Sequence, residues 1–136
     1  MEYVAGLMFS EDKKTLAMVL KNRPAWQAGL FNAIGGKIEE NESPAAAMAR
    51  EFREETGVDT LPEHWMFHTR LEGDGFNVFF YKMFSDKVHA ATTRESETIH
   101  LLNPYALPMN VIHNLRWLIA LALDEHVIVP VVFPHK

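Results

Sequence analysis

The chain has 136 residues, the usual size of one domain, and its 48% hydrophobic and 23% charged residues exclude a disordered or fibrous protein. It has no cysteine, which excludes disulfide frameworks, thiolate metal sites and cysteine nucleophiles. The net charge of −5 lacks the basic excess of a nucleic-acid surface, so no nucleic-acid polymer is expected as a partner.

The apolar segments indicate a protein that does not enter the membrane. The longest apolar run, Trp117 to Leu123, is far shorter than the ~20 residues of a membrane span. No basic and apolar leader opens the sequence, so a secretory signal is not expected. Since no repeat or Gly/Ser linker divides the chain, we expect one cytoplasmic domain over residues 1–136.

The first part of the chain predicts strands. Glu2 to Phe9 and Thr15 to Lys21 are apolar and β-branched runs on either side of a polar turn, which indicates a hairpin. Asn22 to Gly29 reads as a loop, and Leu30 to Ile34 is a short apolar segment that we expect to stop at Gly35-Gly36.

The next segment predicts a helix with both ends marked. Ser43 suits the N-cap and Pro44 the first helical position, while Gly57 suits the position that follows the helix. Apolar residues recur at helical spacing and form one face: Ala45, Met48, Ala49 and Phe52.

The second half alternates strands with another helix. Strands are expected near His64–Leu71 and Phe76–Phe84, joined by a turn at residues 72–75, and a short one at Ile99–Leu102. A helix is expected near Val111–Leu123, with Trp117 in the core, followed by an extended tail, Val127–Phe133. Strands interleaved with two helices predict an α/β layered domain with a mixed sheet.

Three glutamates share one face of the first predicted helix. Glu54 and Glu55 follow Glu51 by three and four positions, with the small Ala47 one turn earlier. Like charges at this spacing destabilise a bare helix. They are explained if a hard cation such as Mg²⁺ or Mn²⁺ binds their oxygens. The alternative is a solvated acidic face.

The spacing around these glutamates favours the metal site. The run reads Gly, five residues, Glu, seven residues, then Arg-Glu-Phe-Arg-Glu-Glu-Thr-Gly-Val. It resembles the Nudix box, with Phe52 where the family usually has an aliphatic residue. The matching positions are Gly36, Glu42, Arg50, Glu51, Phe52, Glu54, Glu55, Gly57 and Val58.

The resemblance implies an α/β/α sandwich in which the box forms a loop–helix–loop. It implies an enzyme that uses Mg²⁺ or Mn²⁺ to hydrolyse phosphoanhydride bonds in nucleoside diphosphate derivatives. Glu51, Glu54 and Glu55 would be metal ligands, with the backbone carbonyl of Gly35 as a further one.

The resemblance also implies roles for other residues of the box. Arg50 would pair with Glu42 and hold the helix against the loop, and we group Arg50 with the catalytic residues. Gly36 and Gly57 would serve backbone shape.

Family members differ in the residue that accepts the proton of the attacking water. The candidates here are Glu54, Glu55 and the distant Glu97, which many relatives match with an acid before a comparable short strand. An exposed loop glutamate is the alternative for Glu97.

The segment before the box resembles MutT-like relatives that cleave nucleoside triphosphates. Asn32 is the candidate for binding a purine base, because an amide both donates and accepts. Lys21, Arg23 and Lys37 are candidates for phosphate or base contacts, and Trp26 for stacking on a base. The alternatives are a turn asparagine and solvated surface residues.

The resemblance leaves four readings of function open. The first is Mg²⁺-dependent hydrolysis of a nucleoside triphosphate, such as an oxidised purine dNTP, to the monophosphate and pyrophosphate by metal-activated water. The second changes the substrate to ADP-ribose, a dinucleoside polyphosphate or an RNA 5′ end. The third is a nucleotide-sensing domain without turnover, and the fourth is a structural domain.

Two further features concern partners and histidines. The tail Val127–Phe133 either adds a strand to a second copy in a homodimer or covers its own core. His64 and His68 lie in a strand-like run and are read as structural, since the histidines show no metal-binding cluster.

Overall fold

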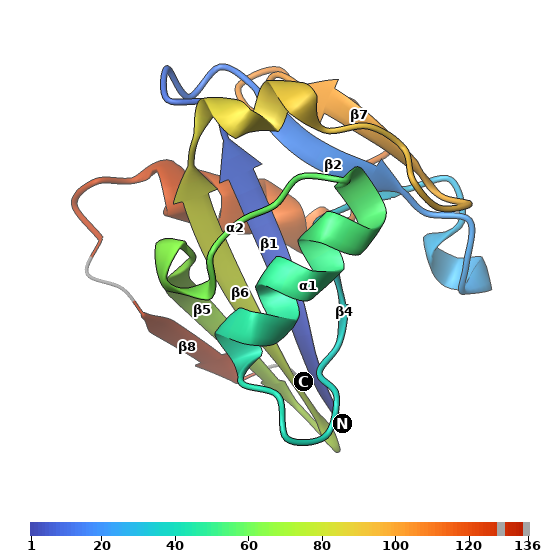
Figure 1. Cartoon of the computed structure of the whole chain (residues 1–136), viewed down its shortest axis with the longest axis vertical. Coiled ribbons are helices and arrows are strands. Elements are labelled where there is room, and N and C mark those ends of the chain that lie inside the picture. Colours follow the sequence, from blue (N-terminus) through green and yellow to red (C-terminus); the bar gives the residue numbers. More distant parts are fainter. Residues whose placement is uncertain (128–129, 135–136) are drawn as a thin grey trace.

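The computed structural model describes residues 1–127 and 130–134, which form a mixed sheet with one helix packed on each face (Figure 1). The helices are α1 (Pro44–Thr56) and α2 (His113–Leu123), with 3-10 turns η1 (Ala25–Gln27), η2 (Pro62–His64) and η3 (Asp86–Ala90). The strands are β1 (Glu2–Phe9), β2 (Leu16–Leu20), β3 (Phe31–Asn32), β4 (Ile34–Lys37), β5 (Met66–Gly73), β6 (Phe76–Phe84), β7 (Thr98–Leu102) and β8 (Val131–Pro134).

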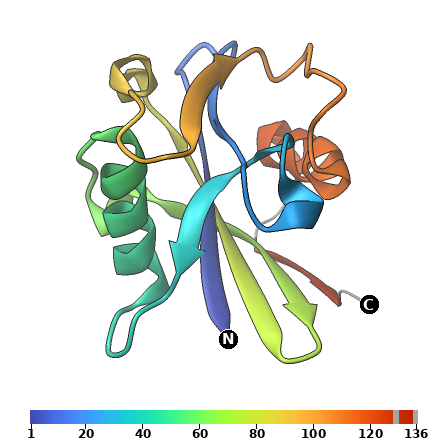
Figure 2. The same cartoon turned by 90° about the vertical axis from the view of Figure 1, so that its right-hand side faces the viewer.

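The sandwich that the sequence predicts is confirmed. In Figure 2, α1 (green) and α2 (orange-red) lie on opposite sides of the sheet. The sheet order is β3-β2-β1-β6-β5-β8, with β4 paired to β1 and β7 paired to β2. The central pair, β1 and β6, is parallel along the whole of β1, from Glu2–Asn77 to Phe9–Phe84.

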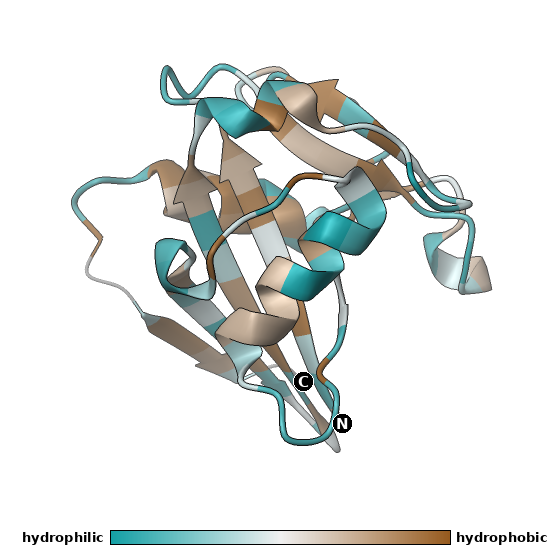
Figure 3. Cartoon of the chain, in the orientation of Figure 1, coloured by the Kyte–Doolittle hydropathy of each residue, from teal (hydrophilic) through white to brown (hydrophobic). Residues whose placement is uncertain are grey.

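Each face of the sheet carries its own apolar core. Side chains alternate along a strand, so Val4 and Met8 of β1 pack toward α1, whereas Leu7 and Phe9 pack toward α2. The buried residues of α1 include Ala47, Met48 and Phe52, and Figure 3 shows hydrophilic bands on the upper turns of the helix. The apolar face of α1 is therefore buried, and its polar face is left for the site.

Helix α1 begins and ends as the sequence predicts. The Ser43 hydroxyl accepts a hydrogen bond from the backbone N–H of Ala46 at 3.1 Å, and Pro44 is the first helical residue. Gly57 follows with φ of 78°, and its N–H donates to the Arg53 carbonyl at 2.8 Å.

The prediction that the chain stops being extended at Gly35-Gly36 is wrong. Both glycines lie inside β4 and pair with β1, Gly35 opposite Ala5 and Gly36 opposite Val4. A side chain on Gly35 would lie 1.9 Å from the Val4 carbonyl oxygen. The glycines therefore permit close strand contact here rather than a turn.

The end of β5, the start of α2 and the position of Trp117 also differ from the predictions. Gly73 ends β5, so the turn to β6 is shorter than the four residues predicted. Helix α2 begins at His113 rather than near Val111, because Val111 forms a parallel bridge with Phe31. Trp117 is 41% exposed rather than in the core, and its ring meets that of Phe133 with centroids 5.0 Å apart.

The tail pairs with its own sheet. Strand β8 runs parallel to β5, with Val131 opposite Thr69 and Phe133 opposite Leu71. This supports the reading in which the tail covers its own core, and the homodimer stays a prediction. Residues 128 and 129 of the predicted tail lie outside the described residues. Within residues 1–127 and 130–134, no helix combines the length and apolar character that crossing a bilayer requires.

His68 is a buried histidine that binds the two layers together. Its Nε2 lies 3.2 Å from the Leu118 carbonyl oxygen of α2, so this nitrogen carries the proton and donates it, while Nδ1 lies 3.0 Å from the Thr69 hydroxyl. Burial lowers the pKa of His68 to about 4, below its ordinary value of 6.5. The ring is therefore neutral in the folded protein near neutral pH.

This histidine should make the fold sensitive to acid. Between pH 6.5 and 4 the unfolded chain binds a proton that the folded chain does not, so the free energy of unfolding falls as pH falls through this window. We expect His68→Gln to reduce the stability difference between pH 7 and pH 4 by ~2 kcal/mol in urea titrations. His113→Gln, at an exposed position, should keep the wild-type profile. Parallel profiles for wild type and His68→Gln would contradict the assignment.

Candidate active site

The acidic face of α1 is organised by one guanidinium group. Arg50 Nε donates to Glu42 Oε2 at 2.7 Å and Nη2 donates to Glu42 Oε1 at 2.9 Å, which is the pairing that the sequence predicts. Nη1 donates to Glu51 at 3.0 Å and to Glu54 at 3.1 Å, while Nη2 also reaches the Lys37 carbonyl oxygen at 3.1 Å. Arg50 thus ties the loop before α1 and the end of β4 to the helix.

These contacts act on the titration of the groups around Arg50. Hydrogen bonds from Arg50 hold the pKa of Glu42 below its ordinary value. The same bonds raise the pKa of Arg50, with the largest effect from Glu42 and smaller effects from Glu51 and Glu54. Burial raises the pKa of Glu51, and its bond to Arg50 offsets only part of this effect.

For Glu55, the effect of burial on the carboxyl group is not offset by a hydrogen bond to Oε2 from the described residues. Glu55 is 8% exposed, and its Oε2 is a buried oxygen for which the described residues provide no hydrogen-bond partner. Burial, followed by repulsion from Glu51 and Glu95, raises the pKa of Glu55 to about 8. A buried oxygen of this kind, beside further carboxylates, is suited to a hard cation.

The carboxylates do not converge on a common point in this structure. Among residues 1–127 and 130–134, no group of three acidic or histidine side chains is arranged to hold a metal ion. Glu51 and Glu54 accept hydrogen bonds from Arg50 instead. The carboxylate oxygens of Glu51, Glu54 and Glu55, one of them unpaired, are nevertheless the ligand type that Mg²⁺ and Mn²⁺ prefer. The three side chains would have to rotate to bind one ion together.

Two glycines of the motif lie close to charged side chains of the site. A side chain on Gly36 would lie 2.5 Å from the Glu51 carboxyl group, so glycine lets β4 pass directly beside the acidic face. A side chain on Gly57 would lie 2.6 Å from Arg94 Nε, at a residue whose φ of +78° already favours glycine. Gly35, whose carbonyl is the fourth predicted metal ligand, lies in β4 next to Gly36.

Glu97 bonds to residues outside α1, although its charge adds to the effects that raise the pKa of Glu55. Its Oε1 accepts from Lys21 Nζ at 2.9 Å, and its Oε2 accepts from the backbone N–H groups of Asn22 at 2.7 Å and Arg23 at 3.4 Å. Both of its oxygens are therefore engaged at the foot of the loop that follows β2. The structure does not place Glu97 in contact with Glu54 or Glu55, and its catalytic role stays a prediction.

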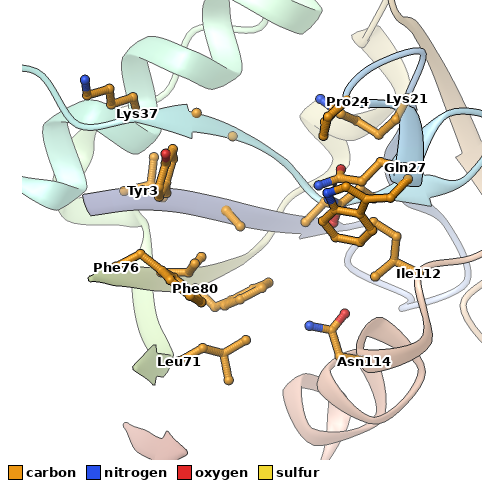
Figure 4. Close-up of a pocket in the computed structure, with 18 residues that line it drawn as sticks. Tyr3, Lys21, Pro24, Gln27, Lys37, Leu71, Phe76, Phe80, Ile112 and Asn114 are labelled. Carbon is orange, nitrogen blue, oxygen red and sulfur yellow. The ribbon is translucent and has the colours of Figure 1, made fainter. Parts of the chain in front are cut away.

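A cavity of about 550 Å³ opens on the other side of β4 (Figure 4). Of the predicted substrate residues, Lys21, Asn32 and Lys37 line it, as do Gly35, Gly36 and Trp26, whereas Arg23 is not among the lining residues. Its apolar walls come from several elements: Tyr3, Leu71, Phe76, Val78, Phe80 and Ile112. This volume suits a small organic ligand.

Three amides point their polar groups toward this cavity or its rim. Asn32 Oδ1 accepts from the N–H of Ala33 at 2.8 Å, and Asn32 Nδ2 donates to Gln27 Oε1 at 3.1 Å. Figure 4 shows the Asn114 amide projecting from α2 toward the space between Leu71 and Ile112. Asn114 Oδ1 is buried, and the described residues provide it with no hydrogen-bond partner.

Sequence reasoning missed Gln27 and Asn114. Neither belongs to a motif, and both enter the site through tertiary packing of η1 and α2 around the sheet. A pattern confined to one segment carries no signal for such residues.

Known proteins resemble this chain in sequence and fold. A NUDIX domain model matches residues 2–119. The CTP pyrophosphohydrolase of Escherichia coli (strain K12) is 40% identical over 72 residues, 51% of this chain and 50% of that protein, so the chain spans about half the length of this curated relative. A MutT structure from work on Aliivibrio salmonicida and Vibrio cholerae has a TM-score of 0.70 at 23% identity, covering 88% of this chain and 96% of that one. A MutT NUDIX hydrolase from Burkholderia pseudomallei has a TM-score of 0.69 at 17% identity, covering 88% and 97%.

Divalent cations should stabilise the folded protein through Glu55. A cation at the unpaired Oε2 relieves repulsion in the folded state and has no comparable site in the unfolded chain. We expect saturating Mn²⁺ to raise the melting temperature by about 5 °C in wild type and by less than about 1 °C in Glu55→Gln.

Glu63→Gln, at an exposed position on η2, is the matched control and should keep the wild-type response. An equal Mn²⁺ response in wild type and Glu55→Gln would place the cation elsewhere.

Proposed function

The chain belongs to the NUDIX family, and we propose that it hydrolyses a nucleoside triphosphate to the monophosphate and pyrophosphate with a divalent cation, Mg²⁺ or Mn²⁺. The observation that carries this proposal is the shared wall between the cavity and the acidic helix. Gly35, Gly36 and Lys37 of β4 line the cavity, and Gly36 is in contact with Glu51 of α1. A base in the cavity would thus extend its phosphates along β4 toward the carboxylates.

The chemistry of the cavity suits a nucleobase. Apolar and aromatic walls favour a flat ring, and Trp26, 68% exposed at the rim, offers a stacking surface. The Asn114 carbonyl has no hydrogen-bond partner among the described residues, and an N–H donor of the ligand would satisfy it. After its bonds to Gln27 and Ala33, Asn32 keeps one N–H and one lone pair, so toward a ligand it can both donate and accept.

Every common nucleobase carries an N–H donor, so the Asn114 acceptor does not choose among them, and two candidates come from other observations. An oxidised purine carries N–H groups on both rings, as the MutT-like segment before the box suggests. Cytosine carries an exocyclic amino group, and the relative named as a CTP pyrophosphohydrolase supports this second candidate. Both readings give the same products, and they differ in which base pairs with Asn114.

The residues of α1 divide the catalytic work. Glu51, Glu54 and Glu55, with the Gly35 carbonyl, would hold the cation, which when bound neutralises phosphate charge and acidifies a water molecule. Glu55, whose Oε2 has no hydrogen-bond partner among the described residues, is the proposed proton acceptor, with Glu54 beside it. Arg50 keeps Glu51 and Glu54 on the side of α1 that faces β4. Lys37 supplies positive charge where β4 leaves the cavity.

Removal of the helix carboxylates should abolish turnover while preserving the fold. We expect Glu54→Gln and Glu55→Gln to lower kcat by ~10²-fold or more, because each removes a cation ligand or the proton acceptor. The assay resolves products from the common (d)NTPs, 8-oxo-dGTP, ADP-ribose, NADH and a dinucleoside tetraphosphate, with Mg²⁺ and with Mn²⁺. Glu63→Gln serves as the charge-matched control.

Pyrophosphate and a monophosphate from one or a few triphosphates would support the proposal and identify the base. Cleavage confined to the diphosphate-linked compounds would overturn the triphosphate assignment and leave the α1 chemistry intact. Near wild-type turnover in both glutamine variants would overturn the role of α1.

Asn114 should contribute to binding of the base. We expect Asn114→Leu to lower kcat/KM for the preferred base by about tenfold to a hundredfold, since the base then loses the acceptor for its N–H group. The variant should keep the Mn²⁺ response of the melting temperature, because Asn114 does not contact α1. An unchanged kcat/KM for that base in Asn114→Leu would remove this residue from recognition.

A further inference from the structure

Glu97 connects two parts of the molecule that are distant in sequence. Through Asn22 and Arg23 it binds the start of the loop at residues 22–29, here called the rim loop, and through Lys21 it binds the end of β2. Its side chain is only 13% exposed, although the neighbouring Glu95 and Ser96 are exposed. This degree of burial and bonding distinguishes Glu97 from a solvated loop glutamate.

The rim loop forms one wall of the cavity. It carries Pro24, Trp26 and Gln27, all of which line the cavity, and Gln27 accepts the hydrogen bond from Asn32. Its far end is closed by the N–H of Gly29, which donates to the Lys21 carbonyl at 2.8 Å. The bonds from Glu97 fix the near end.

The segment that carries Glu97 is anchored on α1. The backbone N–H of Thr92 donates to the Thr56 carbonyl at 3.0 Å, and that of Arg94 donates to the Glu55 carbonyl at 3.3 Å. The Thr93 hydroxyl accepts from the N–H of Ile99 at 3.0 Å, which holds the segment against β7. A continuous set of hydrogen bonds therefore runs from the end of the acidic helix, through residues 92–97, to the rim loop.

We propose that Glu97 is a positioning residue that holds the rim loop at a fixed distance from the carboxylates of α1, and so sets the affinity for the base of the substrate. This inference rests on the proposed nucleotide substrate for its effect on KM, but not for its effect on the loop. It assigns Glu97 a role different from the proton acceptor that the sequence suggests.

The electrostatics of Glu97 agree with this role. Burial alone would raise the pKa of Glu97, but the Lys21 ammonium and the N–H of Asn22 outweigh it, and the pKa is lowered. A carboxylate that stays charged and has both oxygens engaged is a good anchor and a weak proton acceptor.

The test compares Glu97→Gln with wild type by kinetics, binding and hydrogen exchange. We expect KM for the preferred triphosphate, and Kd for its monophosphate product, to rise about tenfold, while kcat changes by less than about threefold. The backbone amides of Asn22 and Arg23 should exchange about tenfold faster or more, because they lose a charged acceptor. Glu97→Asp, which keeps the charge, should recover part of the KM, and Glu63→Gln should behave as wild type.

The outcomes separate this inference from the proposed function. A fall in kcat of ~10²-fold with unchanged KM would overturn the positioning role in favour of proton transfer. Unchanged exchange at Asn22 and Arg23 would overturn it whatever the kinetics. If wild type cleaves no triphosphate, the proposed function fails, and faster loop exchange in Glu97→Gln with weaker monophosphate binding would still support the positioning role.

Discussion

The guanidinium group of Arg50 is the contact on which the site depends. Helix α1 places Glu51, Glu54 and Glu55 within one turn, and such crowding of like charge opposes helix formation. Arg50 bonds to Glu51 and Glu54 and also holds Glu42 and the carbonyl of Lys37. One side chain thus neutralises much of the acidic face and fixes the loop and strand on either side of it. Glu55 Oε2 has no hydrogen-bond partner among the described residues, and burial, followed by repulsion from Glu51 and Glu95, raises the pKa of this carboxyl group.

The second constraint is the close passage of β4 between the helix and the cavity. Gly36 brings the backbone against Glu51, and Gly35 brings it against Val4, so β4 is thin enough to be a wall shared by both sites. A side chain on Gly35 would collide with the Val4 backbone, and one on Gly36 would have to displace the Glu51 carboxylate. The glycines of the motif are therefore explained by distance rather than by flexibility.

Local signals in the sequence predicted α1 and the identity of its acidic face. The cap at Ser43, the proline after it and the glycine at position 57 act within one segment, so a single sequence contains all the information they need. The same holds for the hairpin of β1 and β2. The sequence could not predict the parallel pairing of β1 with β6, because that contact joins residues far apart in the chain. Gln27 and Asn114 were missed for the same reason, and Trp117 is exposed on a face of α2 where its ring packs against Phe133 of the edge strand β8.

The acidic face of α1 and the cavity would bind different parts of a nucleotide through different physical interactions. Under the proposed function, the acidic face would repel a polyphosphate until a cation is present, whereas the cavity would bind a base through apolar contact and the unpaired Asn114 carbonyl. Productive binding requires both at one separation, since a displacement of about 1 Å is enough to misalign a reacting phosphate. That separation is maintained on one side by β4 and on the other by the hydrogen bonds from α1 through residues 92–97 to the rim loop. Because the second route ends on a single buried carboxylate, the geometry of the nucleotide site is expected to be more sensitive to Glu97 than to any of its exposed neighbours.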